Sequence, residues 1–137
     1  MSMKNYLALY LLTGAIFLAI DAIWLGTMSS RFYKPLLGDL LAKDVSLAPA
    51  ILFYLIYVVG MLVFAVLPAV AASNWTSAMA SGALLGLVAY ATYDLTNQST
   101  MRGWPTIVTV ADLAWGTFVT AVSSAAATRL WLWWSAR

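Results

Sequence analysis

The stretch Ala91–Gly116, ATYDLTNQSTMRGWPTIVTVADLAWG, decides the fold, because it joins two apolar segments through one tight polar loop. It also carries two of the chain's five carboxylates, Asp94 and Asp112, within segments that are apolar enough to lie in lipid. An apolar helix, a short polar loop and a second apolar helix are typical of a protein that crosses the membrane several times.

The composition of the whole chain supports this interpretation. Its 137 residues are 64% hydrophobic and 9% charged, and the mean hydropathy is +0.88. A soluble domain carries about 25% charged residues. The length allows one domain, and we expect a single four-helix transmembrane domain over residues 1–137.

The residue types that the chain lacks exclude several kinds of site. There is no His, Cys or Glu, so a histidine or thiolate metal site, a His-ligated haem and a thiol nucleophile are all excluded. We therefore expect no metal and no cofactor. The net charge of +2 is too small to indicate nucleic acid. The basic residues lie at segment ends, where they reach lipid headgroups, so we expect membrane lipids as partners.

Four apolar segments are long enough to cross a bilayer as helices, since about 20 residues span its core. We predict an all-α antiparallel bundle without β-sheet, with helices near residues 4–28, 48–72, 76–97 and 104–130. The first segment could also be read as a signal peptide. Its apolar run is too long for that, and no small-x-small cleavage site follows it.

The connections between these segments differ in length and character. Met28–Ser46 mixes charged, leucine and aromatic residues, which fits a short interfacial helix and an ordered loop equally well. Ser73–Thr76 is so short that the second and third helices form a hairpin. Gly82 and Gly86 form a G-x-x-x-G row that lets another helix approach closely, within the chain or in a homo-oligomer.

The topology groups the connections into two sides, but the charges hardly orient them. The termini and the short turn share side A, and the two polar loops share side B. Three basic residues lie on side A and four on side B, so the positive-inside rule favours a cytoplasmic side B only weakly. A dual-topology dimer fits the same counts.

The same topology brings three carboxylates to one depth. Asp21, Asp94 and Asp112 lie within roughly 5–12 Å of the side B boundary at the helical rise per residue. A carboxylate in the membrane costs about 2.5–3.5 kcal/mol on insertion scales, so its presence needs a reason. Close together in a low dielectric, the three need a proton, a bound cation or Arg102 to compensate their charge.

We therefore predict an aromatic-walled pocket that binds a cation, a proton or a polar substrate. Trp24 and Trp115 each follow an aspartate by three residues and so share its helix face. The predicted lining consists of Asp21, Asp94, Asp112, Trp24, Tyr54, Tyr57, Tyr93, Asn97, Trp104 and Trp115. The alternative is that the acids only cross-link helices by accepting hydrogen bonds from Tyr, Trp and Thr side chains.

The loop motif resembles a known family. The signature runs Tyr93–Gln98 (YDLTNQ), then Thr100, Trp104-Pro105, Asp112 and Trp115-Gly116, and is similar to that of a bacterial family catalogued as domain of unknown function 2177 (DUF2177). Asp21–Trp24 and Tyr54–Gly60 resemble its earlier segments, so the resemblance spans nearly the whole chain. It implies a small four-helix, multi-pass inner-membrane protein and supplies no activity.

Three functions fit these residues. The first is a transporter or channel-like protein, similar in size and aromatic content to small multidrug transporters, although those carry a glutamate where this chain has Asp21 nearer the helix end. The second is a membrane-embedded, lipid-acting enzyme with a carboxylate base and Asn97 or a tyrosine as its polar partner. No nucleophile motif supports that reading, so we lean against an enzyme. The third is an accessory subunit of a larger membrane complex.

Overall fold

Four long helical stretches make up the protein, whose computed structural model describes all 137 residues. In chain order the elements are α1 (Met3–Met28), the π-helical turn η1 (Ser29–Tyr33), α2 (Lys34–Leu37), the 3-10 turn η2 (Gly38–Leu40), α3 (Leu47–Met61), the π-helical turn η3 (Leu62–Val66), α4 (Leu67–Ala71), α5 (Trp75–Thr100) and α6 (Thr106–Ser135). There are no strands. Four stretches are long and apolar enough to cross a membrane, namely Met3–Leu40, Leu47–Ala71, Trp75–Thr100 and Thr106–Ser135. The predicted all-α architecture with four spans is confirmed.

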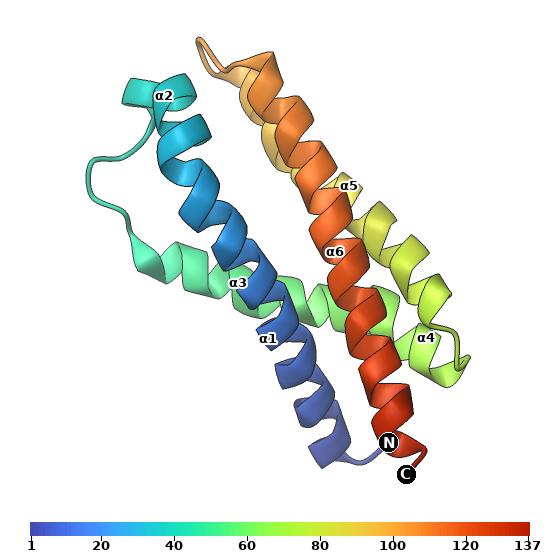
Figure 1. Cartoon of the computed structure of the whole chain (residues 1–137). Coiled ribbons are helices and arrows are strands. Elements are labelled where there is room, and N and C mark those ends of the chain that lie inside the picture. Colours follow the sequence, from blue (N-terminus) through green and yellow to red (C-terminus); the bar gives the residue numbers. More distant parts are fainter.

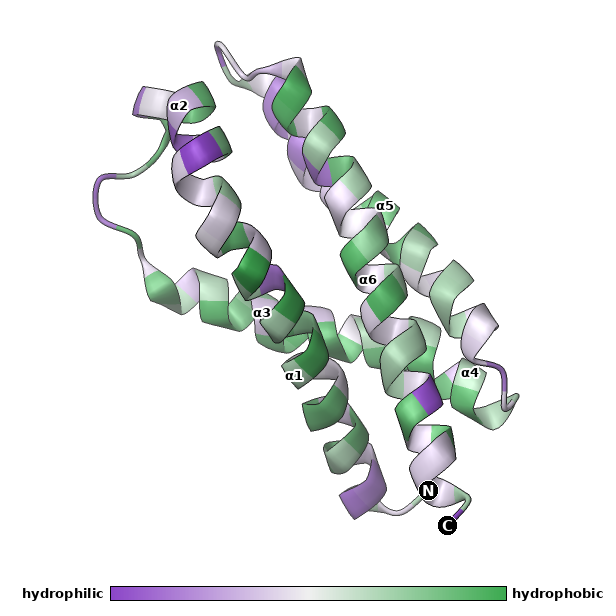
Figure 2. Ribbon diagram, viewed as in Figure 1, coloured by the Kyte–Doolittle hydropathy of each residue, from purple (hydrophilic) through white to green (hydrophobic).

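The helices form a bundle in which one span crosses the others. Figure 1 shows α1, α5 and α6 running along one another, with α3 and α4 crossing them at a steep angle. Both termini and the α4–α5 turn lie at one end, and α2 and the α5–α6 loop lie at the other. In Figure 2 hydrophobic residues run along the helices, and hydrophilic residues gather towards their ends. This is the polarity expected of membrane-spanning helices.

Several helices are longer than predicted. The first continues beyond residue 28 through η1, α2 and η2 to Leu40, so much of the polar connection is helical and only residues 41–46 are irregular. The third runs to Thr100 instead of residue 97, and the fourth to Ser135 instead of residue 130. The fourth helix extends beyond its predicted end because Trp131 still packs in a buried cluster with Leu9, Leu62 and Val66.

The α5–α6 contact depends on small residues. A Cβ atom added at Gly82 would lie 2.7 Å from the carbonyl oxygen of Thr120, and one at Gly86 would collide with the Gly116 backbone. The close approach predicted for this glycine face is therefore confirmed, and it occurs within one chain. Association of copies stays a prediction, and an interface between them would need another surface, because α6 already covers this one.

Candidate functional site

A cavity of about 1100 Å³ lies at the end of the molecule that holds α2. Its wall is formed by α1, η1, α2, η2, the 41–46 segment, α3, α5, the α5–α6 loop and α6. All three predicted carboxylates line it, together with one basic residue, Lys34. Its aromatic lining consists of Trp24, Tyr33, Phe53, Tyr54, Tyr90, Tyr93, Trp104 and Trp115. The cavity therefore combines acids with an aromatic wall, as the sequence predicts.

Asp21 is held by donors from two other helices. Its side chain is only 5% exposed. The Tyr54 hydroxyl on α3 donates a hydrogen bond to Oδ2, and Nε1 of Trp115 on α6 donates one to Oδ1 at 3.0 Å. Hydrogen bonds to a charged acceptor are stronger than neutral ones, so Asp21 ties α1 to α3 and α6 as well as facing the cavity.

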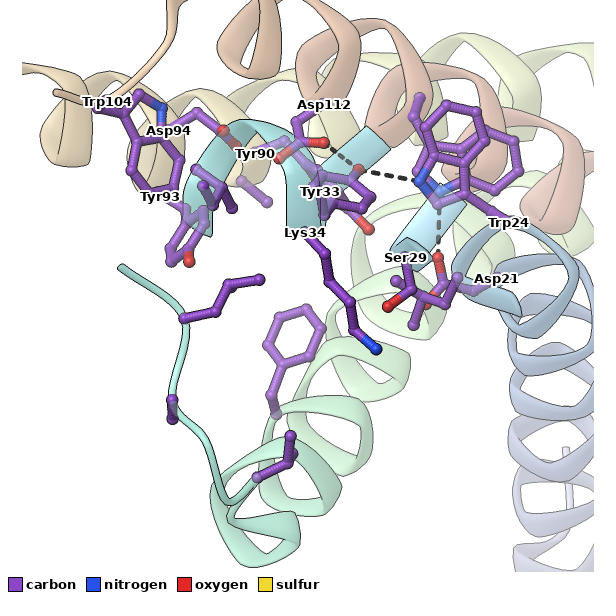
Figure 3. A pocket seen from close by; sticks show the side chains of 18 of the residues that line it. Asp21, Trp24, Ser29, Tyr33, Lys34, Tyr90, Tyr93, Asp94, Trp104 and Asp112 are labelled. Carbon is purple, nitrogen blue, oxygen red and sulfur yellow. Dashed lines mark hydrogen bonds between the residues drawn. The ribbon is translucent and has the colours of Figure 1, made fainter. Parts of the chain in front are cut away.

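Asp112 is hydrogen-bonded to Tyr33, a residue of the π-helical turn η1. The Tyr33 hydroxyl donates to Oδ1 of Asp112 and accepts a hydrogen bond of 3.0 Å from Nε1 of Trp24. Figure 3 shows this chain from Trp24 through Tyr33 to Asp112. The ring of Trp24 also stacks on that of Trp115, with centroids 4.3 Å apart and planes 8° from parallel. The indoles therefore connect the surroundings of Asp21 with those of Asp112.

Asp94 is the exception among the three acids. It is fully buried, and neither carboxyl oxygen meets a donor. Its carboxyl instead lies against that of Asp112, and Figure 3 shows the two side by side. Two adjacent buried carboxylates repel each other unless they share a proton or bind a cation. Asp94 and Asp112 form a pair, whereas Asp21 has partners of its own in Tyr54 and Trp115.

The network around Asp21 yields a first prediction. Tyr54→Phe keeps the ring and removes one donor, so we expect a loss of about 1.5–3 kcal/mol of folding stability, the value of a hydrogen bond to a charged group. Thermal unfolding in detergent measures it. Tyr6→Phe is the control, because Tyr6 is exposed and its hydroxyl makes no hydrogen bond within the protein. Equal unfolding temperatures for the two variants would show that the bond contributes nothing.

The structure places eight of the ten predicted site residues on the cavity and two elsewhere. Tyr57 is buried below it, where its hydroxyl bonds to that of Thr120 at 2.8 Å and its ring packs on Phe17. Asn97 is a helical residue of α5 beside Tyr93 and lies outside the lining. Arg102, predicted as a compensating charge, does not line the cavity either.

Sequence reasoning missed several lining residues, above all Tyr33. No periodicity points to it, because it lies in the polar connection and the π-helical turn changes the register of its side chain. Tyr90 could have been found, since it precedes Asp94 by one helical turn and shares its face. Its ring packs directly on Gly116, where a Cβ atom would collide with it.

Comparison with known protein families gives a match over most of the chain. The family described as Predicted membrane protein (DUF2177) matches residues 6–129. The chain belongs to this family. The DUF2177 match contains all three cavity carboxylates, and it confirms the resemblance carried by the YDLTNQ motif. Together with the four spans it identifies a multi-pass membrane protein. No curated protein and no solved structure matches the chain.

Proposed function

We propose that this DUF2177 protein is a small transporter of the bacterial inner membrane that binds a cation-bearing substrate at the Asp94–Asp112 pair. The observation that carries the proposal is the buried Asp94 carboxyl, which has no donor and lies against Asp112 on a cavity wall. A proton or a cationic substrate can supply the missing positive charge. Because one excludes the other, substrate binding would exchange with protons.

The aromatic wall supports an ammonium group as the cation. Rings of Trp, Tyr and Phe attract a cation placed over their faces, by about 0.5–2 kcal/mol each depending on desolvation. Quaternary ammonium groups suit such a site, because they need no hydrogen-bond acceptor. The lining carries three carboxylates against the single Lys34, so its charge also favours a cation.

Uptake into proteoliposomes tests the proposal. Tetramethylammonium is a suitable probe, because its permanent charge keeps it from crossing lipid unaided. With an acidic interior, we expect radiolabelled tetramethylammonium to accumulate and the internal pH to rise. Asp94→Asn keeps the side-chain shape and removes the charge, so it should abolish uptake.

The control is Asp39→Asn, since Asp39 is exposed and does not line the cavity. It should leave uptake unchanged. Asp94-dependent binding without any uptake would contradict transport and favour the competing proposals, a lipid-acting enzyme or an accessory subunit. Equal uptake by empty liposomes and by both variants would contradict the cation site itself.

A further inference from the structure

We infer that the substrate is an amphiphile that enters from the lipid, with a quaternary ammonium head at Asp94–Asp112 and a hydrocarbon chain between α3 and α5. This inference rests on the proposed function and names its substrate class. The observations behind it are a sideways opening of the cavity, the presence of both acidic and apolar residues in its lining, and the size of the space.

The cavity opens sideways because the first half of α3 stands away from α5. Helix α5 meets this span chiefly through η3 and α4, whereas α3 itself packs on α1. Three lining residues on the edges of the resulting gap are exposed: Val45 by 77%, Phe53 by 46% and Tyr93 by 60%. A ligand could therefore pass between α3 and α5 without displacing a packed helix.

The surface around this gap is apolar. Ile51, Leu52, Leu55 and Ile56 on α3 are all more than half exposed, as expected for side chains that face lipid. A polar solute in water gains nothing from such surroundings. A hydrocarbon chain that arrives from the bilayer keeps apolar neighbours throughout its path.

The lining contains both charged and apolar residues. The Asp94–Asp112 pair belongs to α5 and α6, while the other elements contribute the apolar residues Leu25, Leu37, Leu41, Ala42, Val45 and Phe53 together with Asp21, Ser29, Lys34 and Ser46. The acid pair and these apolar residues match a molecule with one cationic end and one hydrocarbon end. At about 1100 Å³ the space also reaches the upper limit of ordinary ligand pockets, far more than a tetramethylammonium ion needs.

Two probes with the same head test the inference. Dodecyltrimethylammonium, below its micellar concentration, adds a twelve-carbon chain to the head of tetramethylammonium. Ala89 lines the cavity from α5, where it packs beside Phe17 and Tyr57. The added ring of Ala89→Phe should therefore occupy the space between α5 and α3. We expect this change to weaken the binding of dodecyltrimethylammonium about tenfold, the effect of leaving about two methylene groups unburied. The affinity for tetramethylammonium should change less than about twofold.

Binding is measured in the same lipid nanodiscs for every variant, so that partition of the long chain into the bilayer cancels. Val88→Phe is the matched control, since Val88 is 55% exposed and does not line the cavity. It should leave both affinities unchanged. Asp94→Asn should weaken both ligands.

The outcomes separate the two claims. One outcome is that Ala89→Phe leaves the binding of both ligands unchanged, or weakens it equally, while Asp94→Asn weakens the binding of both. The proposal of an amphiphilic substrate is then wrong, and the cation site stands. If Asp94→Asn spares tetramethylammonium, both claims fail. Should Ala89→Phe not fold, a photoreactive group at the end of the chain gives a second test on the wild-type protein. Labelling of Val45, Phe53 or Tyr93 is expected, and labelling confined to Leu52 and Ile56 would overturn the inference.

Discussion

Tetramethylammonium is expected to bind the wild-type protein about tenfold more weakly for each pH unit lowered, over the range in which the Asp94–Asp112 pair holds a proton. The pair accommodates one positive charge, so the bound cation must displace that proton. Lowering the pH raises the concentration of the competitor, and the apparent Kd rises with it. Calorimetric titration in nanodiscs at a series of pH values measures both the affinity and the proton released.

The matching variant is Asp112→Asn, which keeps the shape of the pair and removes one of its charges. We expect it to lose affinity by about 100-fold or more, the range seen when one partner of a buried charge pair is removed. It should also lose the pH dependence and the proton release. Asp44→Asn, in the exposed 41–46 segment, should retain the affinity, its pH dependence and the proton release.

We expect the pair, and not the other groups on the cavity, to carry this exchange. The titratable groups that share its lining are Asp21 from α1, Tyr33 from η1, Lys34 from α2, Tyr54 from α3 and Tyr90 and Tyr93 from α5. Asp21 already accepts two hydrogen bonds from the protein. An Asp112→Asn variant that unfolds more easily but keeps its affinity and pH slope would make the carboxylates helix cross-links without a binding role.

The sequence predicts the depth of the three carboxylates, because the helical rise per residue converts position in a span directly into distance along the membrane normal. The predicted depths group Asp21, Asp94 and Asp112 at one end, and the structure places all three on one cavity. Depth alone does not determine which way a side chain points. Tyr57 has the predicted depth, but its face of α3 turns to Thr120 and the core.

The residues that complete the site depend on irregular backbone, which periodicity cannot anticipate. Tyr33 reaches Asp112 only because the chain continues as helix through a π-helical turn beyond the predicted end of the first span. The tilt of α3 does not follow from the apolar length of the span either, because tilt depends on packing against neighbouring helices, and here α5 meets this span chiefly through η3 and α4. The gap between α3 and α5 follows from that tilt and therefore could not be predicted.

Gly86→Leu is expected to produce the largest loss of stability of any single substitution discussed above. A Cβ atom at this position already collides with the Gly116 backbone, and a carbonyl group in a helix cannot move aside as a flexible side chain can. Forcing extra atoms into a packed core costs about 1–3 kcal/mol, and a clash with backbone belongs at or above the upper end of that range. Thermal unfolding in detergent measures the loss.

The same substitution should also disturb the cavity, because Gly116 supports the ring of Tyr90, which lines it. If α6 is pushed from α5, the Asp94–Asp112 pair separates, since the two residues lie on these two helices. Gly60→Leu is the matched control, as a Cβ atom at Gly60 meets nothing within 4 Å. It should retain both stability and tetramethylammonium binding. Equal unfolding temperatures and equal affinities for the two variants would show that the α5–α6 contact neither limits stability nor sets the geometry of the acid pair.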